Sequence, residues 1–318
     1  YYGEDNNITG LYSHSFPEIP EGYDFDFINP DALLSEISVK GGKAVTGSGK
    51  EYKVICLDRN CTRMSLEVLK KIALLASRGV IICGQVPSVP ASMYDSRTEF
   101  EAIVKDIWFS GRENVFGGTW LDEVMQTSGI SPDLKVLRGR DIRSVHRTLQ
   151  EGEIYWVNSP VSESQSVEVS LRVCGLKPQK WDPMNGEVSD LSYRFDEGRT
   201  IVSLDFEPND AFFIVLREKT DETSFQLPKK KSAILKQLDI NGLGCWTENP
   251  ETRHFSGTRS YSCAVEIPEY SGRLLLDLGE VYNLAQVIID GEPVETLWKA
   301  PFRVDITDYV KGRKTVEL

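Results

Sequence analysis

The sequence of 318 residues lacks the signatures of several protein classes. No uninterrupted apolar run approaches the ~20 residues that a membrane-spanning helix needs, so we expect no membrane partner. Basic residues form no stripe beyond the lysines at positions 229–231, and a net charge of -12 would repel the phosphates of nucleic acid. We therefore expect no nucleic-acid partner.

The chain also has neither an initiator Met nor a secretion signal. It begins at Tyr1 and stops at Leu318 within a pattern that resembles a strand. We interpret it as a piece of a longer protein.

Metal-binding patterns are missing as well. The six cysteines include no CxxC pair and have no histidine at metal-binding spacing, so buried free thiols are the default expectation. Cys245 and Cys263 fall in one predicted domain and could pair in an exported protein, which their spacing alone does not decide. Acidic residues at Asp182, Asp305 and Asp308 lack the repeated oxygen-ligand spacing of calcium loops. The sequence predicts no metal site and no cofactor in this chain.

The first part of the chain alternates strand and helix patterns. Strands are predicted at residues 23–27, 52–57 and 80–83, helices at residues 31–37, 65–75, 99–109 and 120–128, and a Gly-rich hairpin at residues 41–42. The order strand, helix, strand predicts a parallel sheet with helices on both faces. We assign residues 1–150 to this α/β domain.

The middle part consists of strand patterns alone. They lie at residues 154–157, 167–173, 200–206 and 211–216, separated by turn dipeptides such as Asn185-Gly186. We predict a small β-sandwich at residues 151–217. The polar, aperiodic stretch 218–232 is predicted to be a linker.

The last part, residues 233–318, carries the clearest local signals. Apolar and polar residues alternate on either side of Asp290-Gly291, the dipeptide that a two-residue hairpin turn prefers. A further strand pattern covers residues 302–306, after which Thr307 is placed to cap a short turn. These residues predict an all-β domain.

Two motifs in this last part, LDLGEV and IIDGEPVETLWKAPFRVDIT, resemble the galactose-binding-like jelly-roll domain of β-galactosidase and α-L-rhamnosidase families. The resemblance implies a carbohydrate-active protein. It also implies a jelly roll, whose closing strands would lie beyond Leu318 or be disordered.

The whole chain resembles the rear portion of glycoside hydrolase family 106, the α-L-rhamnosidases. The matching segments are YYGEDNNITGLYS, YDFDFINPDALLSEISVKGGKAV, MSLEVLKKIALLASRGVIICG, IYWVNSP, CGLKPQKWDPMNGEV and FEPNDAFFIVL. The resemblance implies a flavodoxin- or amidotransferase-like fold for the first domain and a catalytic (β/α)8 barrel upstream. It also implies inverting hydrolysis assisted by calcium in that barrel, and a periplasmic or extracellular location.

Glycoside hydrolysis needs two carboxyl groups across the scissile bond. In the family both belong to barrel motifs without a counterpart here, so we assign no catalytic residue. One polar cluster, Glu4, Asp5 and Asn6, would follow the first strand of the parallel sheet, at the edge where α/β folds bind ligands. This position makes the cluster a candidate for substrate proximity. Alternatively, Asp5 or Asn6 caps a helix and Glu4 is solvated.

A thiol-dependent amidohydrolase is a third-ranked interpretation, because Cys83 ends a buried strand in a fold that resembles amidotransferases. Such enzymes place Gly two residues before and after the nucleophile, whereas Ile81 and Val86-Pro87 leave no such turn here. We expect Cys83 to be a structural, buried residue.

Aromatic and basic residues of the last domain are candidates for sugar contact, because aromatic faces suit the apolar faces of pyranose rings. These candidates are Trp246, Trp298 and Arg303, with Phe302 beside them. Packing in the core or at an edge of the sandwich is the competing interpretation.

The resulting hypothesis is a multidomain α/β plus all-β chain. It would form the non-catalytic accessory portion of an α-L-rhamnosidase-like hydrolase acting on rhamnose-containing glycans, with carbohydrate and the upstream barrel as partners. The alternative is a standalone carbohydrate-binding protein whose jelly roll grips sugar by itself.

Overall fold

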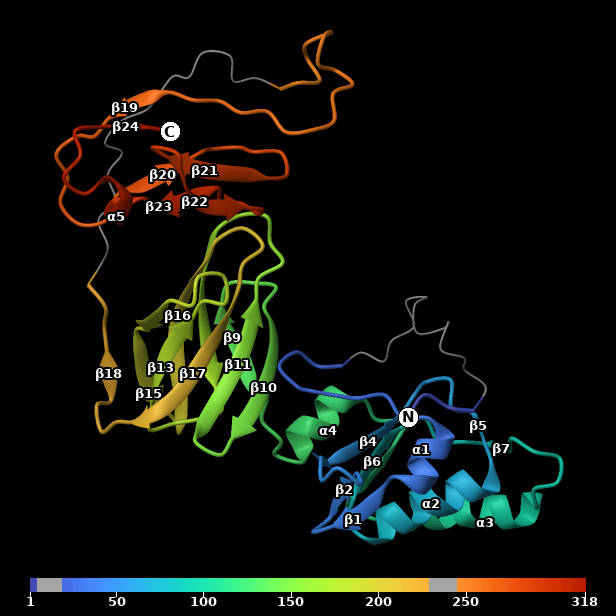
Figure 1. Cartoon of the computed structure of the whole chain (residues 1–318). Helices are drawn as coiled ribbons and strands as arrows, with labels where there is room; N and C mark the ends of the chain where they lie inside the picture. Colours follow the sequence, from blue (N-terminus) through green and yellow to red (C-terminus); the bar gives the residue numbers. More distant parts are fainter. Residues whose placement is uncertain (5–18, 229–244) are drawn as a thin grey trace.

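The computed structural model describes residues 1–4, 19–228 and 245–318. They form an α/β part, a two-sheet β part and a smaller β part, which follow one another along the chain (Figure 1). Each has its own apolar core. Within these ranges no helix is both long and apolar enough to cross a membrane.

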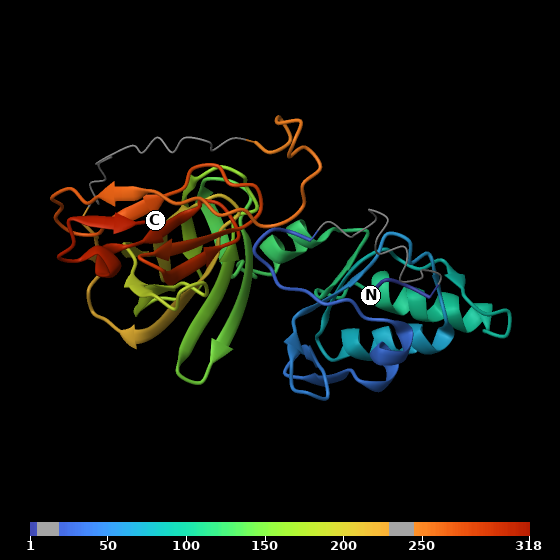
Figure 2. The same ribbon diagram turned by 45° about the horizontal axis from the view of Figure 1, so that its top comes forward.

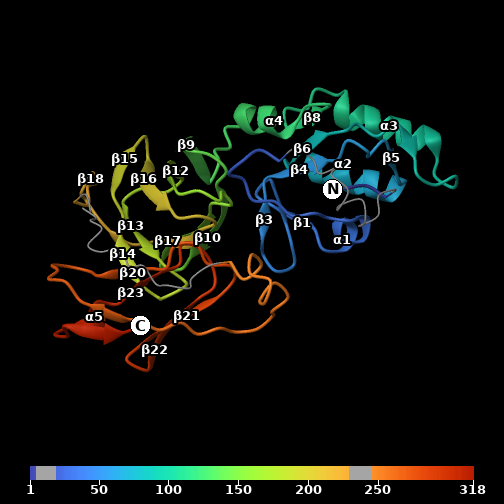
Figure 3. The ribbon, with the colours of Figure 1, turned by 90° about the horizontal axis from the view of Figure 1, so that it is seen from above.

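The α/β part is built on the parallel sheet β4-β6-β8. Its elements are α1 (Pro30–Ser35), β1 (Ser38–Lys40), β2 (Lys43–Val45), β3 (Glu51–Tyr52), β4 (Val54–Leu57), β5 (Arg63–Met64), α2 (Leu66–Ser77), β6 (Ile81–Gly84), β7 (Val89–Pro90), α3 (Arg97–Trp108), β8 (Val115–Gly117) and α4 (Leu121–Thr127). Residues of α1, α2 and α3 pack on one face of the sheet, and α4 packs on the other. Figure 3 shows α1 and α4 on opposite sides of the sheet. The predicted parallel sheet with helices on both faces is therefore confirmed.

One predicted strand of this part is wrong. Residues 23–27 are extended but pair with no strand, although their apolar and polar residues alternate. Phe25 and Phe27 remain 48% and 37% exposed, so the alternating pattern does not bury a face against the sheet. Instead, this segment reaches across to the β-sandwich (Figures 1 and 2).

The middle part contains two five-stranded antiparallel sheets, ordered β10-β11-β17-β13-β14 and β18-β15-β16-β12-β9. Its strands are β9 (Leu134–Arg138), β10 (Arg143–Leu149), β11 (Gly152–Asn158), β12 (Gln165–Leu171), β13 (Leu176–Trp181), β14 (Val188–Asp190), β15 (Tyr193–Asp196), β16 (Arg199–Phe206), β17 (Ala211–Lys219) and β18 (Ser224–Phe225). Side chains from both sheets share one core, which makes this part a sandwich.

The sandwich extends beyond the predicted range at both ends. At its start, β9 and β10 pair with β12 and β11, so the sheets begin at Leu134 rather than after residue 150. At its end, β18 lies within the predicted linker and pairs with β15, because Phe225 packs against the sandwich core.

The third part consists, within residues 245–318, of three antiparallel strand pairs around one core. Its elements are β19 (Ala264–Glu266), β20 (Leu275–Asp277), β21 (Ala285–Ile289), β22 (Glu292–Leu297), β23 (Arg303–Asp305), α5 (Thr307–Val310) and β24 (Thr315–Glu317). The predicted hairpin is confirmed: Asp290 and Gly291, at φ 49° and 85°, connect β21 to β22. The jelly-roll topology stays a prediction.

The predicted cap by Thr307 is wrong. The residue that precedes α5 is Ile306, which offers no side-chain cap. The Thr307 hydroxyl oxygen instead accepts from the Leu274 N–H at 2.8 Å, while the Asp305 carboxylate accepts from the Thr307 N–H at 3.0 Å. Thr307 therefore joins α5 to the segment that leads into β20.

Candidate functional site

The carboxyl edge of the parallel sheet holds Glu4, the first of the predicted substrate-proximal residues. The Tyr1 ammonium donates to the Cys56 carbonyl at 2.8 Å, and the Tyr1 carbonyl accepts from the Asp58 N–H at 3.0 Å, so the chain start runs beside β4. Glu4 follows, and its carboxylate accepts a hydrogen bond from the Ser65 N–H at the start of α2. Glu4 thus lies at the predicted edge of the sheet.

The role of Glu4 in the structure is to cap a helix. A carboxylate at the first turn satisfies a free N–H group and interacts favourably with the helix dipole. Asp95 does the same at the Leu66 N–H, at 3.0 Å, and the Ser65 hydroxyl accepts from Val68 at 3.4 Å. The alternative that Glu4 is only solvated is therefore wrong, while Asp5 and Asn6 lie outside the described residues.

Cys83 is fully buried and lies beside Cys56 across the β4-β6 pair. Its hydrogen bond with Cys56 and its burial raise the pKa of the Cys83 thiol far above its usual range, which disfavours a thiolate nucleophile. Gly84 follows at φ +92°, and a Cβ there would lie 2.1 Å from the Leu57 carbonyl oxygen. The expectation that Cys83 is buried is confirmed, and its structural role stays a prediction.

The three predicted sugar-contact residues have different surroundings. Trp246 donates from its ring N–H to the Tyr261 hydroxyl at 2.9 Å and meets Phe255 edge-on. Arg303 is held by the Asp277 carboxylate at 2.6 Å. Trp298 has 57% of its surface exposed, so its aromatic ring is the one among these candidates that is open to solvent.

Phe302 lies in the core of the third part, with 6% of its surface exposed. This burial agrees with the packing interpretation for that residue. The sugar-contact role of the other three candidates stays a prediction.

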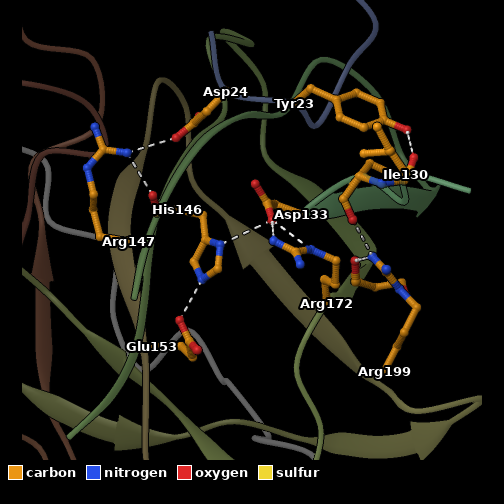
Figure 4. A network of polar contacts seen from close by, with 11 residues as sticks. Tyr23, Asp24, Ile130, Asp133, His146, Arg147, Glu153, Arg172 and Arg199 are labelled. Carbon is orange, nitrogen blue, oxygen red and sulfur yellow. Dashed lines mark hydrogen bonds and ion pairs between the residues drawn. The ribbon is translucent and has the colours of Figure 1, made fainter. Parts of the chain in front are cut away.

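The most elaborate polar arrangement in the described ranges was not predicted. It surrounds His146 on β10, where the sandwich meets the α/β part (Figure 4). The imidazole Nδ1 lies 3.3 Å from the Asp133 carboxylate, and Nε2 lies 2.8 Å from the Glu153 carboxylate. The ring stacks on Tyr155 with centroids 4.1 Å apart, and Arg172 also binds Asp133.

The electrostatics of this network favour a charged imidazole. Burial disfavours the imidazolium and is the largest single influence, but the hydrogen bonds and charges of Asp133 and Glu153 outweigh it and raise the pKa of His146. The same balance holds for Asp133, where burial is outweighed by His146 and Arg172, so its pKa is lowered. Both shifts indicate an ion pair that stabilises the fold.

The network is arranged for structure rather than for catalysis. Asp133 and Glu153 face opposite nitrogens of the imidazole, so the ring fills the space that a glycosidic bond and a water molecule would require. The side chain of His146 is only 9% exposed. Within the described ranges, no group of His, Cys, Asp and Glu is arranged to hold a metal ion.

The region around His146 is also connected to the α/β part by hydrogen bonds between uncharged groups. The Tyr23 hydroxyl donates to the Ile130 carbonyl at 2.7 Å, and the Asp133 N–H donates to the Gly22 carbonyl at 2.8 Å. Arg147, next to His146, binds the Asp24 carboxylate at 2.8 Å (Figure 4). We call the contacts of residues 22–24 with residues 130–133 and 147, together with the His146 network, the first junction.

One sequence signal could have located part of this network. In the β10-β11 hairpin His146 lies opposite Tyr155, and Glu153 lies two residues from Tyr155 on the same face. Pairing the two strand patterns by register would have brought His146 and Glu153 together. Asp133 and Arg172 come from more distant segments and carried no such signal.

Comparisons with known proteins found a matching family model, a similar solved structure and a similar sequence. A family model for alpha-L-rhamnosidase, glycoside hydrolase family 106, matches residues 1–195. The solved structure of a rhamnosidase from Novosphingobium sp. PP1Y aligns with a TM-score of 0.85 and 29% identity, over 99% of this chain and 33% of that chain. A putative beta-glucuronidase from Formosa agariphila is 26% identical over 254 residues, which are 76% of this chain and 21% of that protein. The chain thus spans about a third or less of these two relatives.

Proposed function

Because the chain belongs to the α-L-rhamnosidase family of glycoside hydrolases, family 106, we propose that it is the non-catalytic accessory portion of such an enzyme. The parent enzyme would act on rhamnose-containing glycans, and this portion would brace an upstream (β/α)8 barrel that carries the catalytic carboxylates. A periplasmic or extracellular location belongs to the same proposal.

The observation that carries the proposal is the arrangement of Asp133 and Glu153. Glycoside hydrolysis requires two carboxyl groups roughly 5 Å apart, or roughly 6.5 to 9.5 Å apart, with substrate between them. Here an imidazole occupies that space, and Asp133 is also bound by Arg172. A carboxylate pair held in this way supports a structural role.

The length of the aligned relatives agrees with an accessory role, since most of the Novosphingobium rhamnosidase lies outside the aligned third. Calcium, which the family resemblance implies for the barrel, finds no suitable set of ligands in the part of this chain that the structure describes. We therefore assign no calcium to these residues and derive no step through it.

Hydrolysis of an aryl α-L-rhamnoside tests the proposal. The purified 318-residue chain, shown to be folded by its cooperative thermal unfolding, is expected to release no aryl alcohol. A longer protein made from the gene with its upstream sequence is expected to release it. Hydrolysis by the 318-residue chain alone would contradict the accessory role.

The second candidate function is a standalone carbohydrate-binding protein, and the exposed ring of Trp298 favours it. A rhamnose oligosaccharide titrated into the chain and into its Trp298→Ala variant tests this alternative. Binding that is lost in the variant would support it. An upstream gene sequence that encodes a start codon and signal peptide directly before Tyr1 would support it further.

A further inference from the structure

A cleft of about 650 Å³ lies beside the first junction, between the segment that precedes α1 and two loops of the sandwich. One wall comes from residues 19–25, and the other comes from residues 140–144 and 160–162. The lining residues on which the argument rests are Glu21, Phe25, Arg140, Asp141, Arg143 and Val161.

The walls of this cleft are fixed in place. Gly22 and Tyr23 bond to residues 130–133, and Asp24 binds Arg147, so the first wall is anchored to the sandwich on both sides of Tyr23. Arg140 is anchored from the other side, because its N–H and carbonyl bond to the Gln165 amide at 3.4 and 3.0 Å. A site with such walls needs little rearrangement to bind a ligand.

The side chains at its mouth, in contrast, are not engaged. The side chains of Arg143 and Glu21 are exposed, and neither forms an ion pair or a side-chain hydrogen bond with any described residue. Arg140 approaches Asp141 and Glu163 only at 4.0 Å. Phe25 is 48% exposed and packs at 85° to the Phe27 ring.

We propose that this cleft binds a neutral glycan. Two arginines and two carboxylates line it, so their charges balance and favour neither an anion nor a cation. Planar guanidinium and carboxylate groups donate to and accept from sugar hydroxyls. The half-exposed ring of Phe25 suits the apolar face of a sugar ring, and Val161 adds an apolar wall.

A second cavity has a different lining. A hollow of about 440 Å³ beside α3 is lined by Pro87, Phe100, Val104 and Phe109 together with Ser88, Glu101 and Lys105. It contains no arginine. Phe109, 72% exposed, therefore provides a matched aromatic control outside the cleft.

The choice of a glycan as ligand rests on the proposed function, whereas the position of the cleft does not. Saturation-transfer NMR titrations of the 318-residue chain with methyl α-L-rhamnoside and with a rhamnose-containing oligosaccharide test the proposal. We expect the Phe25→Ala variant to bind roughly tenfold more weakly, as expected for one lost stacking contact. The Arg143→Ala variant should bind several-fold more weakly, and the Phe109→Ala variant should bind like the parent chain.

Salt dependence tests the ligand class. Affinity for the neutral sugars should be unchanged between about 0.05 and 0.5 M NaCl, since screening weakens only interactions between charges. Stronger binding of glucuronate that falls with salt would overturn the assignment to neutral glycans.

Three further outcomes would overturn the cleft itself. They are no binding of either sugar by the folded chain, unchanged binding in both cleft variants, and binding lost only in Trp298→Ala. The last would favour the standalone binding protein. Phe25 and Arg143 are exposed, so unchanged thermal midpoints are expected and confirm that these variants fold. Hydrolysis by the isolated chain, in contrast, would overturn the accessory role and leave the cleft intact.

Discussion

The two junctions of the molecule are built from different interactions. The first junction combines neutral hydrogen bonds at Tyr23 and Gly22 and the partly exposed Arg147–Asp24 pair with the largely buried ion-pair network of His146. The contacts between the sandwich and the third part, which we call the second junction, are ion pairs: Lys299–Asp210 at 3.1 Å, Arg273–Glu187 at 3.5 Å and Arg303–Glu207 at 3.7 Å.

The two junctions should differ in how strongly salt weakens them. Exposed ion pairs contribute little and are screened by salt, whereas neutral hydrogen bonds and buried pairs are screened much less. In Arg273–Glu187 and Arg303–Glu207, each side chain is about half exposed. We therefore expect the α/β part and the sandwich to respond as one unit, and the third part to respond separately.

The largest expected effect comes from breaking the first junction. Asp133→Ala leaves His146 and Arg172 without their shared carboxylate, and removing one partner from a partly buried ion pair costs about 3 kcal/mol. Denaturant unfolding followed by tryptophan fluorescence should show this loss. Asp205→Ala, at an exposed carboxylate of the same sandwich, is the control and should change stability by less than about 0.5 kcal/mol. Equal losses in both variants would contradict the importance of the first junction.

A smaller effect is expected from pH, again at the first junction. The pKa of His146 is raised in the folded chain, so its contribution to stability is fully present below its ordinary value of 6.5. That contribution is lost as pH rises through the raised pKa. The difference in unfolding free energy between the parent chain and His146→Gln should therefore shrink with rising pH.

The control for the pH series is His254→Gln, because His254 is exposed. A His146→Gln difference that stays constant across the pH range would show that the imidazole of His146 does not change its charge in this range.

The smallest effect is expected at the second junction. Glu187→Ala removes the pair with Arg273, in which both side chains are about half exposed, and should cost less than about 1 kcal/mol. The loss should diminish at about 1 M NaCl, where the Debye length is only about 3 Å. Amide exchange in β23, compared with that of Lys314→Ala, measures it. A salt-independent loss would indicate that packing, rather than charge, holds the third part.

Local patterns predicted the elements of this molecule well. The Asp290-Gly291 turn and the helix after Ser65 depend on neighbouring residues only, so their signals are readable in the sequence. The prediction of a strand at residues 23–27 was wrong because apolar and polar residues also alternate in this unpaired segment, which connects the α/β part to the sandwich. Its contacts to the sandwich are to residues more than a hundred positions away, and Asp26 binds Lys50 and Tyr52 of the α/β part.

The candidate sites were less predictable for the same reason. Glu4 was placed at the correct edge of the sheet, but its partner, the Ser65 N–H, became clear only from the position of α2. The His146 network joins residues of two strands and two connecting segments, and the cleft joins two parts of the chain. Tertiary pairing, rather than local composition, creates both.

Strand β10 contributes to both the network and the cleft, and it does so through alternate residues. Ser144 and His146 point to one face, while Arg143 and Arg147 point to the other. Inserting or deleting a single residue here would turn His146 outward and bring Val145 or Arg147 against Tyr155. Natural variants of this hairpin should therefore differ in side-chain identity far more readily than in length.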